Sequence, residues 1–283
     1  MQSAKRSNKE RTYHSSVGIG EIRMKCKDLI AKLEELSPAM YAMDWDNSGL
    51  LVGDSEKEVT KVLLSVDVTD EVVDEAIREG ADMILAHHPL IFSKINKVVA
   101  NDFIGRRIIR MIENGICCYC MHTNFDVMGM ADAAADELRL LQSEVLMVTY
   151  EDDISKEGIG RFGFLKDICS LQELAERVKE SFALEHVTAY GDRNTEVAKV
   201  AISTGSGKSV IKYALATDCD VIITGDIDYH TALDSVAQGL CIIDAGHFGL
   251  EKLFITYLQE YLRREVPSIA TVKSSQGEIG YVI

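Results

Sequence analysis

Short apolar runs alternate with amphipathic segments along the first half of the chain. Residues 59–69 (VTKVLLSVDVT), 82–88 (DMILAHH) and 116–126 (ICCYCMHTNFD) each contain a run of mainly apolar side chains. Residues 70–81 and 102–115, which lie between these runs, repeat apolar side chains every three or four positions, as helices on a core do. Apolar strands separated by helices are typical of a parallel sheet that is buried on both faces. This pattern predicts an α/β fold.

The pattern recurs 138 positions later. Residues 59–86 align without a gap with residues 197–224, and eight of the 28 aligned pairs are identical. Any two strand–helix–strand units resemble each other to some degree, but an ungapped match of this length favours an internal duplication. The second copy continues with a predicted helix at 229–239, a strand at 240–247 and a long helix from 248 to about 264. We therefore predict two similar α/β domains.

The flanking segments complete the predicted organisation. Residues 1–23 are polar and predict a flexible tail, the first domain runs from 24 to 140, and the second runs from 141 to 283. Residues 24–38 (MKCKDLIAKLEELSP) predict an amphipathic helix packed on the first domain, and the C-terminal strand is a candidate to return to that domain. Between the two halves, we predict a linker or surface loop at 150–158, a helix at 170–182 and a strand at 186–192, and residues 161–167 (RFGFLKD) belong to the same insert.

The charge of the chain limits the classes of partner. The formal net charge is −15 at pH 7, and a surface this acidic repels the phosphates of nucleic acids while it suits cations. The sequence has no run of eighteen apolar residues and no secretory signal pattern at its start. We therefore expect a cytoplasmic protein that binds neither nucleic acid nor membranes.

The seven cysteines favour buried thiols. Three of them form CCYC at 117–120, which contains the C-x-x-C spacing. Cys117 and Cys120 would point to opposite faces of a strand, whereas a redox C-x-x-C usually opens a helix. Thiols in a core, kept reduced in the cytosol, are the favoured interpretation.

Polar side chains collect at the carboxyl ends of the predicted strands, where open α/β sheets bind their ligands. Five of the seven histidines lie there, and the exceptions are His14 and His186. Several carboxylates lie in the same segments. The strand-end residues are His87, His88, His122, Asp126, Asp226, Asp228, His230, Asp244, His247 and Glu251.

Five of these residues form a candidate metal site. His247 and Glu251 are four residues apart at the start of a predicted helix and share one face. His87 and His88 end one predicted strand, and Asp126 adds a carboxylate from its neighbour. Mixed nitrogen and oxygen donors suit Zn, Fe, Mn, Ni or Co, and a carboxylate bridges two ions about 3.5–4 Å apart in many two-metal sites. The sequence therefore predicts a site for one divalent metal ion or for two neighbouring ones.

Some of these residues and motifs also have ordinary structural interpretations. A lone histidine at a strand end is usually an ordinary surface or core residue, which is the favoured interpretation of His186 and His230, whereas the pair His87 and His88 needs polar partners if it is buried. STGSGKS at 203–209 resembles a P-loop, but Ile202 occupies the position of the first glycine of that motif. The turn is a weak candidate for binding a substrate phosphate. No G-x-S-x-G motif occurs, so a serine hydrolase is not supported.

Five segments together resemble a known family. They look like the signature segments of the GTP cyclohydrolase 1 type 2 homolog family, also called Nif3-like dinuclear metal-centre proteins, and the resemblance covers about Met24 to the C-terminus. Two departures concern loops: VMGMAD replaces a Gly-Gly-x-Asn stretch after Asp126, and the chain ends in GEIGYVI without a Pro-Phe. The segments are MDWDNSGLLVGD (43–54), AHHPLIF (86–92), HTNFD (122–126), GDIDYH (225–230) and DAGHFGLE (244–251).

The resemblance implies a two-domain α/β fold, two divalent metal ions in the cleft between the domains, and a ring-shaped homohexamer. The metal ligands of the family fall on the five residues already selected. It also implies a metal-dependent hydrolase, whose metal-bridging hydroxide would attack a nucleotide-like, pterin-like or phosphoester substrate. The five ligand positions are His87, His88, Asp126, His247 and Glu251.

Further roles follow for neighbouring residues. His122 and His230 are the candidates for an acid, a base or a substrate contact, and Asp228 or Asp244 is the candidate to orient a ligand histidine. Two other classes of function stay open. One is a non-catalytic metal-binding scaffold, a metal-insertion protein or a regulatory interaction protein, because no general base stands out beyond the ligands. The other is a nucleotide-binding regulator that uses residues 203–209.

Overall fold

The structure is a computed structural model that describes residues 24–280, so the tail predicted at 1–23 lies outside the described residues. The strands are β1 (Met24–Lys25), β2 (Gly49–Val52), β3 (Glu58–Val59), β4 (Lys61–Ser65), β5 (Met83–Ala86), β6 (Cys117–Cys120), β7 (Leu141–Glu151), β8 (Lys156–Ser170), β9 (Thr188–Tyr190), β10 (Glu196–Ser206), β11 (Val221–Gly225), β12 (Cys241–Asp244) and β13 (Ala270–Lys273). The α-helices are α1 (Cys26–Leu36), α2 (Asp70–Glu79), α3 (Phe103–Glu113), α4 (Thr123–Phe125), α5 (Ala131–Glu137), α6 (Leu171–Ser181), α7 (Ile211–Ala216), α8 (Tyr229–Ala237), α9 (His247–Glu251) and α10 (Leu253–Glu265). The 3-10 helices are η1 (Ala39–Tyr41) and η3 (Gly207–Ser209), and η2 (Asp126–Met130) is a π-helix. None of the helices within these residues is long and apolar enough to cross a membrane.

The first large sheet contains the three strands predicted in the first half. Its order is β13-β4-β5-β6-β2, in which β2 alone runs antiparallel to its neighbour. Alternate strand residues enter two cores: α1 and α10 cover one face of the sheet, and α2 and α3 cover the other. Cys117 belongs to the first core and Cys120 to the second, as expected for a strand with two buried faces. The predicted α/β fold is confirmed.

Local sequence explains where the helix after β4 begins and ends. The Thr69 side chain caps α2 by accepting a hydrogen bond from the backbone N–H of Val72. Gly80 ends α2 with φ of +63°, a left-handed conformation that glycine adopts without a steric penalty. The helix is therefore short, and the chain turns back directly into β5.

The second large sheet has the order β7-β8-β10-β11-β12-β9. Strands β10, β11 and β12 are parallel, and β9 pairs antiparallel with β12 just as β2 pairs with β6. Helices α5 and α6 cover one face, and α7 and α8 cover the other. The strand order β4-β5-β6-β2 of the first sheet therefore recurs as β10-β11-β12-β9 in the second, while the duplication itself stays a prediction about ancestry.

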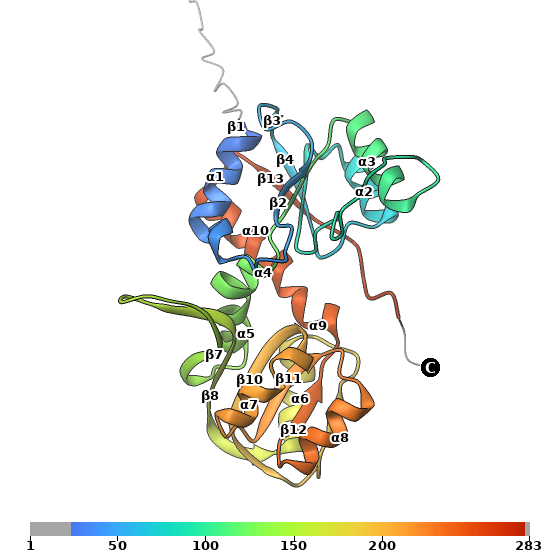
Figure 1. The fold of residues 1–283 in the computed structure, drawn as a ribbon. Coiled ribbons are helices and arrows are strands. Elements are labelled where there is room, and N and C mark those ends of the chain that lie inside the picture. The colour runs from blue at the N-terminus through green and yellow to red at the C-terminus, as the bar shows by residue number, and fades with distance from the viewer. Residues whose placement is uncertain (1–23, 281–283) are drawn as a thin grey trace, which may run out of the picture.

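A long hairpin extends from the second sheet (Figure 1). Strands β7 and β8 form it, and the predicted linker at 150–158 contains its turn. Most β7 side chains are exposed or half-exposed, so the strand has no apolar run from which it could be predicted. The structure therefore adds two strands that the pattern of apolar residues did not predict.

The helix predicted from 248 to about 264 is divided at Lys252 into α9 and α10. Helix α9 belongs to the second sheet, whereas Phe254, Leu258 and Leu262 of α10 are buried in the core of the first sheet. Strand β13 then pairs with β4. The chain therefore crosses back to the first sheet at Lys252, which places α9 between the two sheets (Figure 1).

Candidate metal centre

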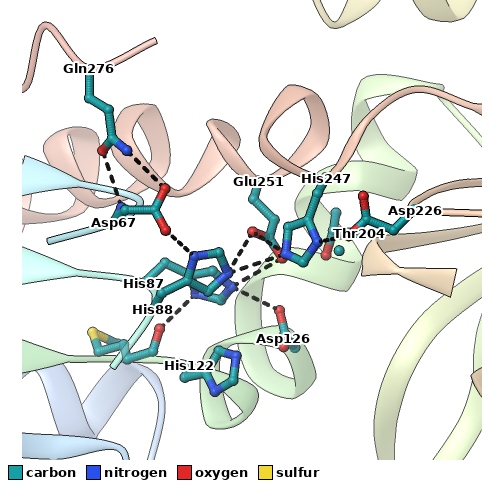
Figure 2. A network of polar contacts seen from close by, with 12 residues as sticks. Asp67, His87, His88, His122, Asp126, Thr204, Asp226, His247, Glu251 and Gln276 are labelled. Carbon is teal, nitrogen blue, oxygen red and sulfur yellow. Dashed lines mark hydrogen bonds and ion pairs between the residues drawn. The ribbon is translucent and has the colours of Figure 1, made fainter. Parts of the chain in front are cut away.

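The five predicted ligands lie together where the two sheets meet (Figure 2). His87 and His88 follow β5, Asp126 begins η2, and His247 and Glu251 lie one turn apart on α9. The Nε2 atom of His87 is 3.5 Å from both Asp126 Oδ1 and Glu251 Oε1. The Nε2 atoms of His88 and His247 are 3.0 and 3.1 Å from Glu251 Oε2, and 3.3 Å from each other.

Backbone geometry brings α9 close to the strands of the second sheet. Gly246 precedes the helix with φ of +74°. At Gly225, which ends β11, an added Cβ would lie 2.6 Å from the backbone nitrogen of His247. A side chain at 225 would therefore push α9, and with it His247, away from the cluster.

Each imidazole of the cluster is oriented in the same way. The Nδ1 atom points outward, where its hydrogen is donated to an oxygen, so that Nε2 faces inward. The acceptors are Met121 O for His87 at 2.8 Å, Asp67 Oδ1 for His88 at 2.7 Å and Asp226 Oδ2 for His247 at 2.7 Å. Because these acceptors have no hydrogen to donate, they select the tautomer that metal-binding histidines need.

Three buried polar atoms at this place have no hydrogen-bond partner within the described part of the chain. They are Nε2 of His87, Oδ1 of Asp126 and Oε2 of Glu251. Buried polar groups without partners are costly and rare in folded proteins. Atoms that all face one point and lack hydrogen bonds suit a cation, so the residues present fit a metal.

The donor atoms form two overlapping groups. His88, His247 and Glu251 form one, and His87, Asp126 and Glu251 form the other, with all donor atoms of a group within 4.8 Å of one another. Glu251 belongs to both, and a different carboxylate oxygen lies nearest to each group. Glu251 is therefore the residue that the two groups share.

The charges of the cluster favour positive ions. Burial alone would lower the pKa of His88, but the carboxylates of Asp67 and Glu251 raise it to about 10. Glu251 likewise raises the pKa of His247 to about 9, against the effect of burial. Burial likewise opposes ionisation of Glu251, yet the histidines around it hold its pKa well below its usual range. The cluster therefore attracts protons, or a metal in their place.

The glycine-rich turn at 203–209 serves this cluster. Gly205 has φ of +68°, and an added Cβ would lie 2.6 Å from Glu251 Oε1. The helix after the turn, α7, has only six residues, and Lys208 forms an ion pair with Asp228. The turn therefore makes room for a carboxylate of the chain itself, and its geometry gives no support to a phosphate or nucleotide site.

The two acid–base candidates differ in position. His122 lies beside the cluster and forms a third group of donor atoms with His87 and His88. Its Nδ1 donates to Asp46 Oδ1 at 2.8 Å. His230 is exposed on α8, contacts the ring of Tyr229, and belongs to none of the three donor groups found among the described residues. The structure therefore gives an acid or base role to His122 more support than to His230.

Asp228 and Asp244, the residues expected to orient a ligand histidine, have other partners in the structure. Asp228 caps α8, and Asp244 accepts hydrogen bonds from the backbone of Ile227 and Gly246. Neither contacts a histidine of the cluster; Asp226 does so instead. Asp226 has φ of +55°, which is uncommon outside glycine and often marks a functional position.

The comparisons with known proteins agree with the resemblance seen in the sequence. The family model Duf34/NIF3 (NGG1p interacting factor 3) matches residues 24–277. The chain belongs to this family. A GTP cyclohydrolase 1 type 2 homolog from Clostridium acetobutylicum is 37% identical to this NIF3-family chain over 230 residues, which are 81% of this chain and 85% of the relative.

Solved structures with the same fold support the assignment. The Bacillus cereus protein related to NIF3 superposes with a TM-score of 0.85 at 26% identity, over 92% of this chain and 99% of that one. Reduced HcgD from Methanocaldococcus jannaschii has a TM-score of 0.78 at 29% identity, over 90% of this chain and 99% of that one. The NIF3 fold therefore extends over nearly the whole described chain.

Three residues of the NIF3 site were missed by sequence reasoning. Asp67 orients His88, and Gln276 donates from Nε2 to Asp67 Oδ2 at 2.8 Å (Figure 2). Asp46, whose side chain is fully buried, orients His122. Asp67 directly follows β4, so the rule of strand ends would have found it. Gln276 comes from the C-terminal segment, and no pattern in the sequence connects it with β4.

A pocket of about 650 Å³ opens beside the cluster. Residues of both sheets line it, including His88 and His247, and the C-terminal segment around Gln276 forms one wall. Arg107 lines the same pocket, and its Nη2 lies 3.4 Å from Asp70. The cluster is therefore accessible to a small molecule.

Proposed function

We propose that this NIF3-family chain binds two divalent metal ions through His87, His88, Asp126, His247 and Glu251, and that it is a metal-dependent hydrolase. The observation that carries the proposal is the Glu251 carboxylate, which lies between two donor groups that contain buried atoms without hydrogen bonds. Zn, Fe, Mn, Ni and Co all suit these donors.

The substrate class that we propose is a nucleotide-like or pterin-like molecule or a phosphoester. The curated relatives bear the name GTP cyclohydrolase 1 type 2 homolog, which supports the first two. The adjacent pocket has the volume of a small-molecule site, and its Arg107 suits an anionic group.

The chemistry divides between the ions and the chain. Two divalent ions would supply a Lewis acid and a water of lowered pKa. The outer carboxylates Asp67 and Asp226 hold the imidazoles so that Nε2 faces the ions. His122 is held by Asp46 at Nδ1, which leaves its Nε2 free to accept a proton from water or to give one to a leaving group.

Metal analysis tests the first part of the proposal. Purified protein should contain close to two transition-metal ions per chain, and the double variant His87→Ala, His247→Ala should lose most of them. The matched control is His186→Ala, His230→Ala, which removes two exposed histidines outside the cluster. Full metal retention in the first double variant contradicts the site.

A turnover screen tests the second part. Metal-dependent hydrolysis of a nucleotide, a pterin or a phosphoester supports the hydrolase. Metal binding without turnover on these panels, together with transfer of the metal to an apo-protein acceptor, favours the non-catalytic scaffold. The structure contains one chain, so the hexamer implied by the family resemblance stays a prediction.

A further inference from the structure

Three rings form an aromatic group on the open side of His122. The ring centroids of Trp45 and Phe92 are 6.0 Å apart, and each lies near the imidazole of His122, at 6.0 and 6.4 Å. The planes are inclined to one another by 57° to 77°. We call Trp45, Phe92 and His122 the aromatic corner, because inclined rings enclose an angle rather than a flat surface.

The aromatic corner is open to solvent. Trp45 and Phe92 each expose 59% of their surface, although large aromatic side chains are usually covered. Neighbouring exposed rings of this size commonly mark a binding site. Neither position is needed to fill the cores of the two sheets, so packing does not explain these rings.

Hydrogen bonds hold the aromatic corner in place. Asp46, next to Trp45, binds His122 at Nδ1 and accepts from the hydroxyl and the backbone N–H of Thr123. Asn47 donates from Nδ2 to the backbone oxygen of Ile91, next to Phe92, at 2.5 Å. The two segments that carry the rings are therefore tied together before any ligand arrives, which reduces the entropy lost on binding.

The aromatic corner adjoins the candidate metal centre. The centroid of the His122 ring is 5.3 Å from that of His87 and 5.6 Å from that of His88. His122 is thus shared by the aromatic corner and the cluster of donor atoms. A ring bound between Trp45 and Phe92 would have one edge beside the ions that the proposed function places there.

We propose that the aromatic corner binds the planar heteroaromatic ring of the substrate, the chemical class of nucleobases and pterins. The proposal rests on the proposed function and narrows its substrate class. Aromatic side chains stack on such rings whatever their substituents, because every ring of this kind offers a π face. A second copy of the chain is the competing occupant, but an angle between three rings fits one thin ring better than a protein surface.

The chain provides its own reporter for this test. Trp45 is the only tryptophan among 283 residues, so its fluorescence reports on the aromatic corner alone. Guanosine, adenosine and pterin are titrated into metal-loaded full-length protein, with ribose as the control without a ring. At least one of the three ring compounds should quench Trp45 with saturation, and ribose should leave its emission unchanged.

Substitutions then locate the binding. Phe92→Ala keeps the reporter and should raise the Kd of the ring compound about tenfold, in line with the loss of one stacking contact. Trp45→Leu, followed by calorimetry, should have a similar effect. The matched control is Tyr229→Ala, because Tyr229 is also exposed and lies edge-on to a histidine, His230, but stands outside the donor groups. Its Kd should equal that of the unmodified protein.

Several results would overturn the proposal. One is the absence of quenching by all three ring compounds while the protein retains its metal. Another is an unchanged Kd in Phe92→Ala and Trp45→Leu when circular dichroism shows that both are folded. Dissociation of an oligomer by these variants, with ring binding intact, would assign the aromatic corner to a subunit interface. Ring binding by a protein that holds no metal contradicts the proposed function alone, so the two failures are distinguishable.

Discussion

The two halves of the molecule use equivalent positions for opposite purposes. The shift of 138 residues that aligns the halves pairs His88 with Asp226. His88 contributes a donor atom to the cluster, whereas Asp226 accepts the hydrogen of His247 and orients that ligand. The same shift pairs His87 with Gly225, which allows α9 to approach. One strand end therefore supplies ligands, and its counterpart positions the ligands of the other half.

The exchange of roles extends to the first strand of each half. Asp67 follows β4 and orients His88, while its counterpart Gly205 leaves space for the carboxylate of Glu251. After the third strand, both halves enter a short helical segment that carries ligands: Asp126 in one, His247 and Glu251 in the other. The shared arrangement of strands thus fixes the positions from which donor atoms reach the cluster. Local substitutions decide which half provides each donor atom.

The largest expected effect comes from the residue that joins both donor groups. Glu251→Gln keeps the shape of the side chain but removes its charge, so binding of both ions should fail, and metal content should fall from about two ions per chain to less than one. Elemental analysis of the purified protein measures this. Glu260→Gln, an exposed glutamate on α10, is the control and should keep its metal. Loss of one ion only would show that the halves bind their ions separately.

The metal affinity should depend on pH, because one histidine of each half must lose a proton when metal binds. In protein stripped of metal by a chelator, the pKa of His88 is about 10 and that of His247 about 9, so both rings are protonated at pH 7. Both must lose a proton to bind metal, and the apparent affinity should rise by about two log units per pH unit between pH 7 and 8. Calorimetry in two buffers of different ionisation enthalpy counts the protons released. A count near zero contradicts this prediction.

The stability of the protein stripped of metal should fall as the pH rises, whereas its metal affinity should rise. The pKa of an unperturbed histidine is 6.5, and the folded protein raises it at both positions. Between pH 6.5 and about 10, the native state therefore holds protons that the unfolded chain has released, and the free energy of unfolding falls as the pH rises. This contribution is complete below pH 6.5 and absent above pH 10. Urea denaturation at pH 6.5 and 9.5 measures the difference.

The orienting carboxylates of the two halves should have unequal effects. Asp67→Asn and Asp226→Asn should each weaken metal binding ten- to hundredfold, as is usual for groups that orient metal-binding histidines. We expect the larger loss for Asp67, since Gln276 holds it, whereas the side chain of Asp226 is 57% exposed. Metal affinity is measured by competition with a chelating dye. Asp228→Asn is the control, and an equal loss in that variant would refute the assignment.

The smallest expected effect concerns the support behind Asp67. Gln276→Ala removes three hydrogen bonds: one to the carboxylate of Asp67, one from the backbone N–H of Asp67 and one from the hydroxyl of Ser65. The carboxylate of Asp67 remains, so metal affinity should fall only about two- to fivefold. Gln238→Ala, which changes an exposed glutamine at the C-terminal end of α8, should have no effect. A loss as large as that of Asp67→Asn would mean that the C-terminal segment, not the carboxylate, fixes His88.

The pattern of apolar residues along the chain predicted the strands that are buried on both faces. The strands β4, β5 and β6 and their counterparts were found because their residues are apolar without alternation. Strands β7 and β8 were missed, since the exposed hairpin has no such run. The break at Lys252 was missed as well, because apolar residues continue through it and only the position of the two sheets separates α9 from α10.

The residues of the candidate site also divide into those that the sequence predicted and those that it did not. The residues that face the cluster stand at strand ends, where topology makes their positions predictable. The residues that orient them depend on side-chain geometry over long separations: Gln276 meets Asp67 across 209 residues, and Asp46 meets His122 across 76. An error of two positions, from Asp226 to Asp228, was enough to assign the wrong carboxylate to His247. Sequence spacing cannot supply that precision.

The return of the chain to the first sheet has a consequence for protein synthesis. Strand β13 covers the edge of β4, and α10 fills the core beneath it, yet both are translated after all the strands of the second sheet. Until then, the nascent chain displays an unpaired edge and an apolar face on its first sheet, the surfaces from which aggregates grow. Completion of the first sheet must therefore wait until residues 253–273 are translated, and nascent chains that stall before residue 253 should depend on chaperones.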